Sequence, residues 1–181
     1  PLSCKGRTNK DGIIYTHTVL DLNAIEIQFV RGLYVMPEEE ATIIKEYSEE
    51  NDIEIHVHAP YYINLAGNNE ETEMSFEKIM RAAQMADKIG AKTVVTHPGF
   101  YGENSEKKTL KLIIKHTKKL TNMLKKEKIK AKIGIETMGK QKVFGTLDEI
   151  IEICRNVKGV VPVIDLAHIH ARENGSLKKR E

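Results

Sequence analysis

Short apolar runs alternate along the chain with longer segments in which apolar residues recur every three or four positions. The short runs are five to seven residues long and rich in isoleucine and valine, as expected of strands that are covered on both faces of a sheet. They predict strands over residues 24–30, 53–58, 93–97, 132–136 and 161–165.

The intervening segments carry the end signals of helices. Three glutamates follow Pro37, and acidic side chains are favoured in the first turn of a helix. Thr146 with Glu149 matches a capping box, and Gly90 stands where a C-terminal cap is expected. Together with the helical spacing of apolar residues, these signals predict helices over 11–20, from 37, over 74–89, over 105–126 and from 146.

Strands that alternate with helices predict a parallel sheet, either open and doubly wound or closed into a barrel. The chain has neither a GxGxxG nor a Walker A sequence, which disfavours the common nucleotide-binding open sheets. A closed eight-stranded barrel usually needs about 250 residues, whereas this chain has 181. We therefore predict an α/β fold of the (β/α)8 TIM-barrel type that is incomplete. It forms a single partial domain over residues 1–181, with about five to six βα units, and lacks the first strand and the last two. A complete, smaller open-sheet domain is the alternative.

Composition narrows the class of protein without defining it. Apolar residues make up 40% and charged residues 30%, which is typical of a globular domain. No apolar run approaches the roughly 20 residues of a membrane span, so no membrane partner is expected. Cys4 and Cys154 do not form a disulfide framework, which favours the reducing cytoplasm. The net charge of +2 is too small to indicate a polyanionic partner.

Residues that bind divalent cations end four of the five predicted strands. They are His58, His97, Glu136 and Asp165, and His168 follows three residues after the last of these. The carboxyl ends of parallel strands meet at one edge of a sheet, so we expect these side chains to converge there. Imidazole and carboxylate groups suit zinc. Glu136 lies between the histidines and Asp165 in strand order, so it can bridge two metals, which would clamp both the attacking and the leaving oxygens of a phosphate. One such histidine alone is more often structural, but four equivalent positions in succession favour a metal site.

Other polar residues carry weaker signals. Tyr61 and Tyr62 follow His58 on the same edge, where a ring can stack on a base or simply pack under the loop. His56 shares the strand parity of His58 and is expected to support the site. His17 and His116 fall in helical segments, where we expect solvated side chains.

Lysine is concentrated in one stretch of the chain. Eleven lysines lie between Lys107 and Lys132, mostly on an outer helix, so a solvated face is favoured over a nucleic-acid patch. Lys5, Arg7 and Lys10 belong to a predicted loop at the strand-end edge and are better candidates for contacts to phosphate.

Four motifs together resemble the endonuclease IV family: HAPYYINLA (58–66), THPGFYG (96–102), IETMGKQ (135–141) and IDLAHIHA (164–171). Their order, spacing and strand context agree across nearly the whole chain. The resemblance implies a xylose-isomerase-like barrel with three zinc ions. It also implies hydrolysis of the phosphodiester on the 5′ side of an abasic site in double-stranded DNA.

The resemblance also implies roles for single residues. His58, His97 and Glu136 match the ligands of the first zinc, and Glu136, which we take as the catalytic carboxylate, also reaches the second. Asp165 matches a further ligand of the second zinc, and His168 matches one ligand of the third.

Contacts to DNA are implied in the same way. Tyr61 matches a tyrosine that enters the DNA beside the lesion, and Arg31 is a looser match to a DNA-contacting residue. With Lys5 and Arg7, these are the residues expected to bind DNA.

The chain departs from the family pattern at its end. A further His and Glu for the second zinc, and an Asp-x-His pair for the third, are absent, so only the first site has all its protein ligands. If the sequence is a fragment, the activity belongs to the parent protein. We expect a monomer for a full-length protein and association for a truncated one.

Two alternatives to the nuclease remain open. One is a sugar isomerase or epimerase that uses Glu136 and Asp165 around a single divalent ion on the same barrel. The other is a non-catalytic remnant that binds DNA. The pair His58 and His97, with Tyr61 nearby, favours the nuclease.

Overall fold

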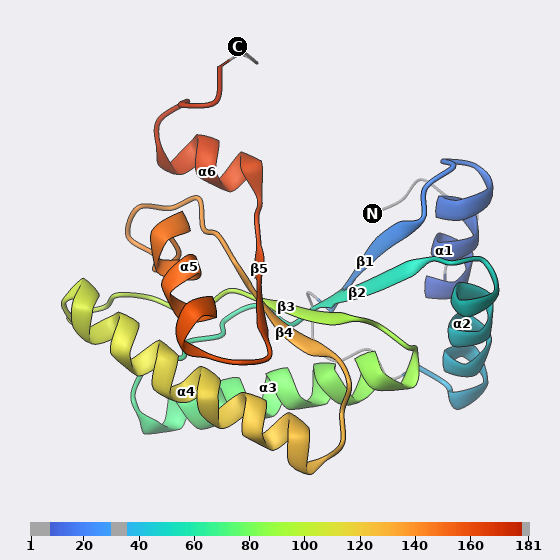
Figure 1. Ribbon diagram of the computed structural model, residues 1–181, viewed down its shortest axis with the longest axis horizontal. Coiled ribbons are helices and arrows are strands. Elements are labelled where there is room, and N and C mark those ends of the chain that lie inside the picture. Colours follow the sequence, from blue (N-terminus) through green and yellow to red (C-terminus); the bar gives the residue numbers. More distant parts are fainter. Residues whose placement is uncertain (1–7, 30–35, 179–181) are drawn as a thin grey trace.

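The computed structural model describes residues 8–29 and 36–178, in which strands and helices alternate. The predicted Arg31, Lys5 and Arg7 lie outside the described residues. The elements shown in Figure 1 are α1 (Asn9–Thr18), β1 (Ala24–Gln28), α2 (Glu38–Glu50), β2 (Glu54–His58), α3 (Asn69–Lys88), β3 (Thr93–Thr96), α4 (Glu106–Lys126), β4 (Lys132–Glu136), α5 (Leu147–Asn156), β5 (Val160–Val163) and α6 (Leu166–Arg172).

The strands form one parallel sheet in the order β1-β2-β3-β4-β5. Each strand pairs with its neighbour along the chain, as in a barrel, whereas a doubly wound sheet reverses its order at a switch point. The prediction of an α/β fold of the TIM-barrel type is therefore confirmed.

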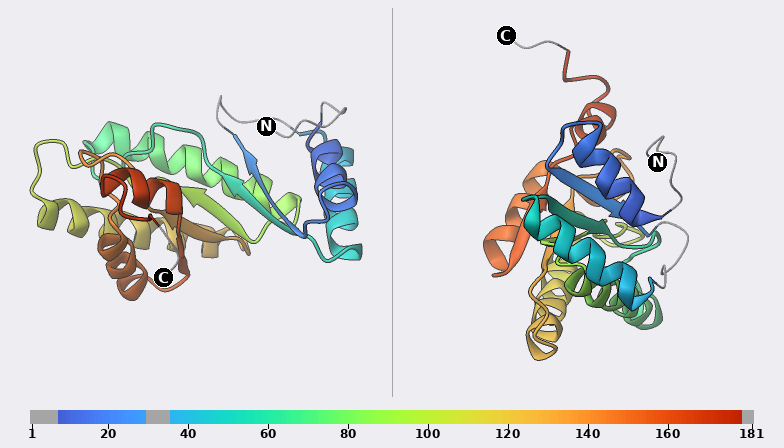
Figure 2. Two further views of the ribbon diagram at one scale, coloured as in Figure 1. Left: turned by 90° about the horizontal axis from the view of Figure 1, so that it is seen from above. Right: turned by 90° about the vertical axis from the view of Figure 1, so that its right-hand side faces the viewer.

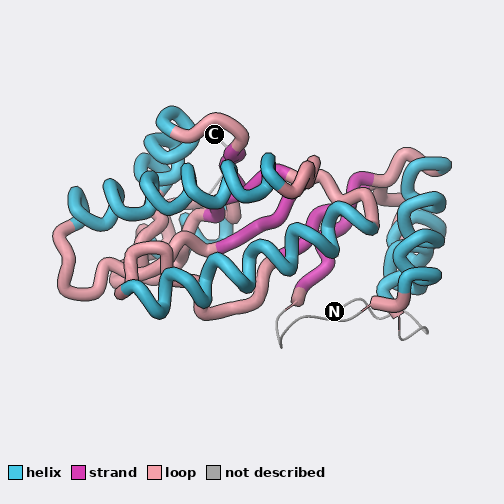
Figure 3. The backbone as a smooth tube through the Cα atoms, turned by 90° about the horizontal axis from the view of Figure 1, so that it is seen from below, coloured by secondary structure: helices cyan, strands magenta, loops and turns pink. Residues whose placement is uncertain are grey.

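Helices cover the outer face of this sheet. The long helices α3 and α4 run beside each other below β2 and β3 (Figures 1 and 3), while α1 and α2 pack together next to β1 (Figure 2). Ile55, Val57, Ile133 and Ile135 point toward the helices and are almost completely buried. None of the helices within 8–29 and 36–178 has the length and hydropathy required to cross a membrane.

The opposite face of the sheet carries the polar side chains. The parallel register places Gln28 beside His58 and Glu136 beside Val163. Because side chains alternate along each strand, His58 and Glu136 share this inner face, and His97 follows β3 in the same phase. The fold thus directs all three toward one end of the inner face.

Several predicted boundaries differ from the structure. The first strand ends at Gln28, two residues earlier than predicted, and β5 ends at Val163, so Asp165 is not a strand residue. Helix α3 begins five residues before the predicted start, because its first turn is polar and is capped by Asn68. The chain also contains α6, a helix that the apolar pattern did not predict.

Candidate metal centre

Three side chains meet at the carboxyl ends of β2, β3 and β4. His58 and Glu136 are the last residues of β2 and β4, and His97 directly follows β3. The Oε2 atom of Glu136 lies 3.2 Å from Nε2 of His58 and 2.9 Å from Nε2 of His97. These residues, which the sequence predicted to converge, form a first triad that is largely buried.

The orientation of His58 is set by its own strand end. Its Nδ1 lies 2.7 Å from the carbonyl oxygen of Ala59, which can only accept, so Nδ1 carries the hydrogen. Nε2 therefore faces the carboxylate of Glu136, as a donor when the ring is protonated and as a lone pair when it is neutral. Two acceptors facing each other need a proton or a cation between them, and two imidazole nitrogens with a carboxylate oxygen are a donor set that zinc accepts.

The charge state of the first triad also favours a cation. Burial alone would raise the pKa of Glu136, but the adjacent imidazoles of His58 and His97 outweigh it and lower the pKa to about 2. Burial alone would lower the pKa of His58, but Glu136, the Ala59 carbonyl and the more distant Glu26 together raise it. The site thus holds an ionised carboxylate and stabilises positive charge beside it.

A second triad uses the other oxygen of the same carboxylate. Oε1 of Glu136 lies 3.8 Å from Nδ1 of His168, and that nitrogen lies 3.6 Å from Oδ2 of Asp165. Nδ1 of His168 donates to the carbonyl of Thr137 at 2.8 Å, which leaves Nε2 as its free lone pair. In each triad, one ligand atom per residue lies within 4.8 Å of the others.

Asp165 reaches this position as the N-cap of α6. Its Oδ1 accepts the backbone N–H of His168 at 2.9 Å, which fixes the first turn of the helix. Its backbone N–H donates to Oγ1 of Thr137 at 3.0 Å, so the start of α6 is tied to the residue that follows Glu136.

Tyr61 lies beside the first triad. Its ring centroid is 5.7 Å from those of both His58 and His97, and the residue is 41% exposed. Lys10, placed by the sequence in a loop at the strand-end edge, is instead in the first turn of α1.

The expectation of solvated rings is wrong for His17 and His116. Nδ1 of His17 lies 2.9 Å from the hydroxyl of Tyr47. His116 donates from Nδ1 to the carbonyl of Leu65 at 2.7 Å, with its ring edge-on to Phe76. Both side chains are half-buried because neighbouring elements pack over them, which the sequence of one helix does not reveal.

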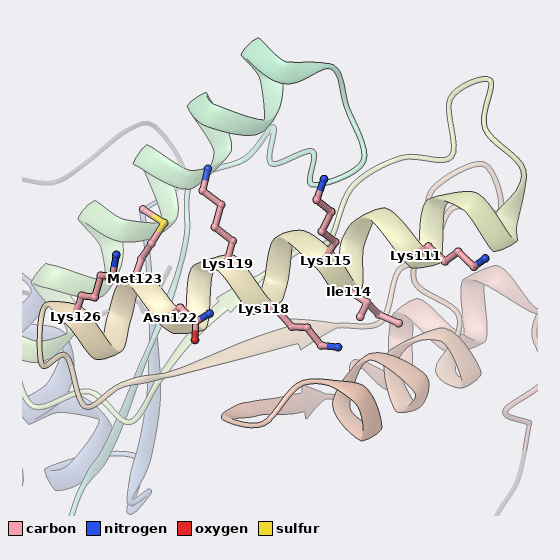
Figure 4. A pocket seen from close by; sticks show the side chains of 8 residues that line it. All are labelled: Lys111, Ile114, Lys115, Lys118, Lys119, Asn122, Met123 and Lys126. Carbon is pink, nitrogen blue, oxygen red and sulfur yellow. The ribbon is translucent and has the colours of Figure 1, made fainter.

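The lysine-rich helix bounds a separate groove of about 970 Å³ (Figure 4). None of its lining residues belongs to either triad, and all of them come from α4. Lys119 pairs with Glu73 at 2.7 Å and lies 4.4 Å from the ring centroid of Phe76. The groove is lined by Lys111, Ile114, Lys115, Lys118, Lys119, Asn122, Met123 and Lys126.

The fold and the site define a parallel α/β barrel sheet with a cluster of histidines and carboxylates at its carboxyl edge. Residues 20–180 match the family of the xylose isomerase-like TIM barrel, and the chain belongs to this family. An uncharacterized protein of Methanocaldococcus jannaschii, MJ0133, is 38% identical over 157 residues, which are 86% of this chain and 56% of that protein.

Other relatives carry names that refer to function. A probable endonuclease 4 of Mycoplasma mycoides is 31% identical over 121 residues, which cover 63% of this chain and 40% of that protein. The chain thus spans about half the length of the curated relatives it matches. The resemblance seen in the four motifs is confirmed at the level of the family.

Solved structures of two kinds share the fold. Endonuclease IV from Thermus thermophilus matches with a TM-score of 0.69 and 20% identity, over 94% of this chain and 62% of that chain. A D-tagatose 3-epimerase-like protein matches with a TM-score of 0.67 and 26% identity, over 82% of this chain and 58% of that chain.

Proposed function

We propose that the protein is a zinc-dependent DNA-repair endonuclease that hydrolyses the phosphodiester 5′ to an abasic site in double-stranded DNA. The observation that carries the proposal is the pair of triads that share Glu136 at the carboxyl edge of the sheet. The similarity to probable endonuclease 4 supports it independently.

The two oxygens of Glu136 face different partners. Oε2 faces His58 and His97, and Oε1 faces His168. A carboxylate in this arrangement would contribute one oxygen to each of two cations, and Asp165 would be a further ligand of the second. Zinc supplies Lewis-acid polarisation of the phosphate and a nucleophilic water at neutral pH.

Tyr61 is the residue we assign to the DNA beside the lesion. Its ring is partly exposed at the mouth of the first triad, where a base or sugar opened from the stack would meet it. Hydrolysis at this point joins a water oxygen to phosphorus and releases the 3′ oxygen of the preceding nucleotide as a hydroxyl.

A duplex with a single tetrahydrofuran abasic analogue tests the proposal. We expect zinc-dependent nicking 5′ to the analogue, loss of nicking with EDTA and recovery when zinc is returned. Glu136→Gln is expected to lower nicking at least about 100-fold, because both proposed cation positions lose the carboxylate that they share. Glu103→Gln, an exposed glutamate in the β3–α4 loop, is the matched control and should nick normally. Duplex binding that survives EDTA with no nicking at any zinc concentration would identify a non-catalytic DNA-binding protein instead.

A sugar epimerase is the second candidate, because the D-tagatose 3-epimerase-like structure is 26% identical to the chain. Glu136 and Asp165 would then flank one cation and move a proton next to a carbonyl group. A panel of ketoses assayed beside the duplex separates the two functions. Turnover of a ketose without nicking would overturn the nuclease.

A further inference from the structure

Arg172 lies at the end of α6 and reaches into the loop that follows β4. This β4–α5 loop, residues 138–145, is closed by a hydrogen bond from the N–H of Met138 to the carbonyl of Gly145 at 2.8 Å. The guanidinium of Arg172 donates to four backbone carbonyls of the loop, those of Met138, Lys140, Gln141 and Val143, at 3.3, 2.8, 3.4 and 2.8 Å. In return, the side chain of Gln141 donates to the carbonyl of Arg172 at 3.0 Å.

The same guanidinium links this loop to two more elements. It donates to the hydroxyl of Tyr101 at 3.3 Å, and that hydroxyl donates to the carboxylate of Glu149 at 2.8 Å. Glu149 in turn accepts the N–H groups of Gly145 and Thr146 at the start of α5. Burial, followed by the bond to Glu149, raises the pKa of Tyr101, so the hydroxyl stays a donor at neutral pH.

These contacts join the loops that follow three neighbouring strands. Tyr101 lies after β3, the β4–α5 loop lies after β4, and Arg172 lies on the helix after β5. His97, Glu136 and Asp165 stand at the starts of the same three connections. The network therefore links the three connections at residues that follow His97, Glu136 and Asp165 in the chain. There it can fix the distances between the connections.

The link to the second triad is direct, because Arg172 is four residues after His168 on α6. Residues with this spacing lie on one face of a helix, so both face the β4–α5 loop. A Cβ placed on Gly139 of that loop would lie 3.3 Å from Cδ2 of His168, and Nδ1 of His168 is held by the carbonyl of Thr137. The loop that accepts the guanidinium therefore passes close to the ring of His168.

We propose that Arg172 is a positioning residue that holds α6 against the β4–α5 loop and thereby sets the distance of His168 from Glu136 and Asp165. Arg172 touches no reacting group in this role. Its effect on cation binding rests on the proposed function, whereas its effect on α6 does not.

Two measurements on Arg172→Met test this role. In hydrogen exchange without added metal, we expect amides of α6 and of residues 138–145 to exchange at least about tenfold faster, with α3 unchanged. In a Co²⁺ titration followed by absorbance, we expect the affinity of the second position to fall about 10- to 100-fold, while the first position changes less than twofold. Arg172→Lys should be intermediate, because one ammonium cannot span the carbonyls that a guanidinium reaches.

Arg155→Met is the matched control, since Arg155 is an exposed arginine near the end of α5. It should leave both measurements unchanged. Faster exchange over the whole chain, equal weakening of both Co²⁺ positions, or no change in either measurement would overturn the positioning role. If the wild-type protein binds no Co²⁺, the proposed cation site fails, and the exchange experiment still decides the role of Arg172.

Discussion

Two groups of histidines in the described chain have different roles. His58 and His97 direct Nε2 at Glu136 and His168 lies beside that carboxylate, whereas His116 holds the α3 side of the fold by its bond to Leu65 and its edge contact with Phe76. The difference arises from position. His58 ends β2, His97 directly follows β3 and His168 lies in the first turn of α6 after β5, whereas His116 lies in the middle of α4.

His116→Ala is expected to lower the free energy of unfolding by about 1–3 kcal/mol, because it leaves the carbonyl of the fully buried Leu65 without its partner. Urea denaturation measures this. His170→Ala removes an exposed histidine and should change the free energy by less than about 0.5 kcal/mol. Equal effects of the two substitutions would show that the bond to Leu65 adds nothing.

The residues of the first triad could be predicted from sequence, because the ends of parallel strands converge whatever the loops do. The network around Arg172 could not, since four of its acceptors are backbone carbonyls, which every residue possesses. Only the folded β4–α5 loop turns those carbonyls toward one point.

Of the six helices in the described residues, all but α2 begin at a residue whose side chain caps the helix. Thr8, Asn68 and Thr146 each form a capping box with the acidic residue three positions later. The sequence predicted the box at Thr146. It did not predict the box at Asn68, because the apolar positions of α3 begin only at Met74 and the first turn of the helix is polar. The sequence did not predict α6, because Asp165 comes at the end of the apolar run of β5 and was assigned to that strand. In the structure its side chain caps α6 instead.

Asn68→Ala is expected to lower the free energy of unfolding by about 1 kcal/mol, because the N–H of Glu71 loses its acceptor. Asn68→Gly should cost only a few tenths of a kcal/mol, since glycine is a tolerated N-cap. Thermal or urea unfolding of the pair checks the order. A glycine variant as unstable as the alanine variant would argue against the cap.

At the scale of the whole molecule, β1 and β5 form the two edges of the described sheet. Large apolar side chains are exposed beyond β5, with Ile164 at 44% and Leu166 at 63%. Unpaired strand edges with apolar surface nearby favour association between chains.

The 181-residue polypeptide, purified by itself, is therefore expected to self-associate. Light scattering after size exclusion should give a mass above that of one chain, which rises with concentration. Leu166→Lys should lower the associated fraction, whereas Lys158→Ala, an exposed position on the α5–β5 turn, should not. A concentration-independent mass of one chain would contradict the expectation.

The two proposed cation positions share the carboxylate of Glu136, which would make them thermodynamically dependent. The first ion to bind would hold the side chain of Glu136 in one rotamer. The second would then meet an ordered ligand, but also the charge of the first ion. By reciprocity, each ion alters the affinity of the other by the same factor. A titration with metal should therefore not fit two independent sites. The ion that binds first should occupy the position whose ligands are held more rigidly in the metal-free protein.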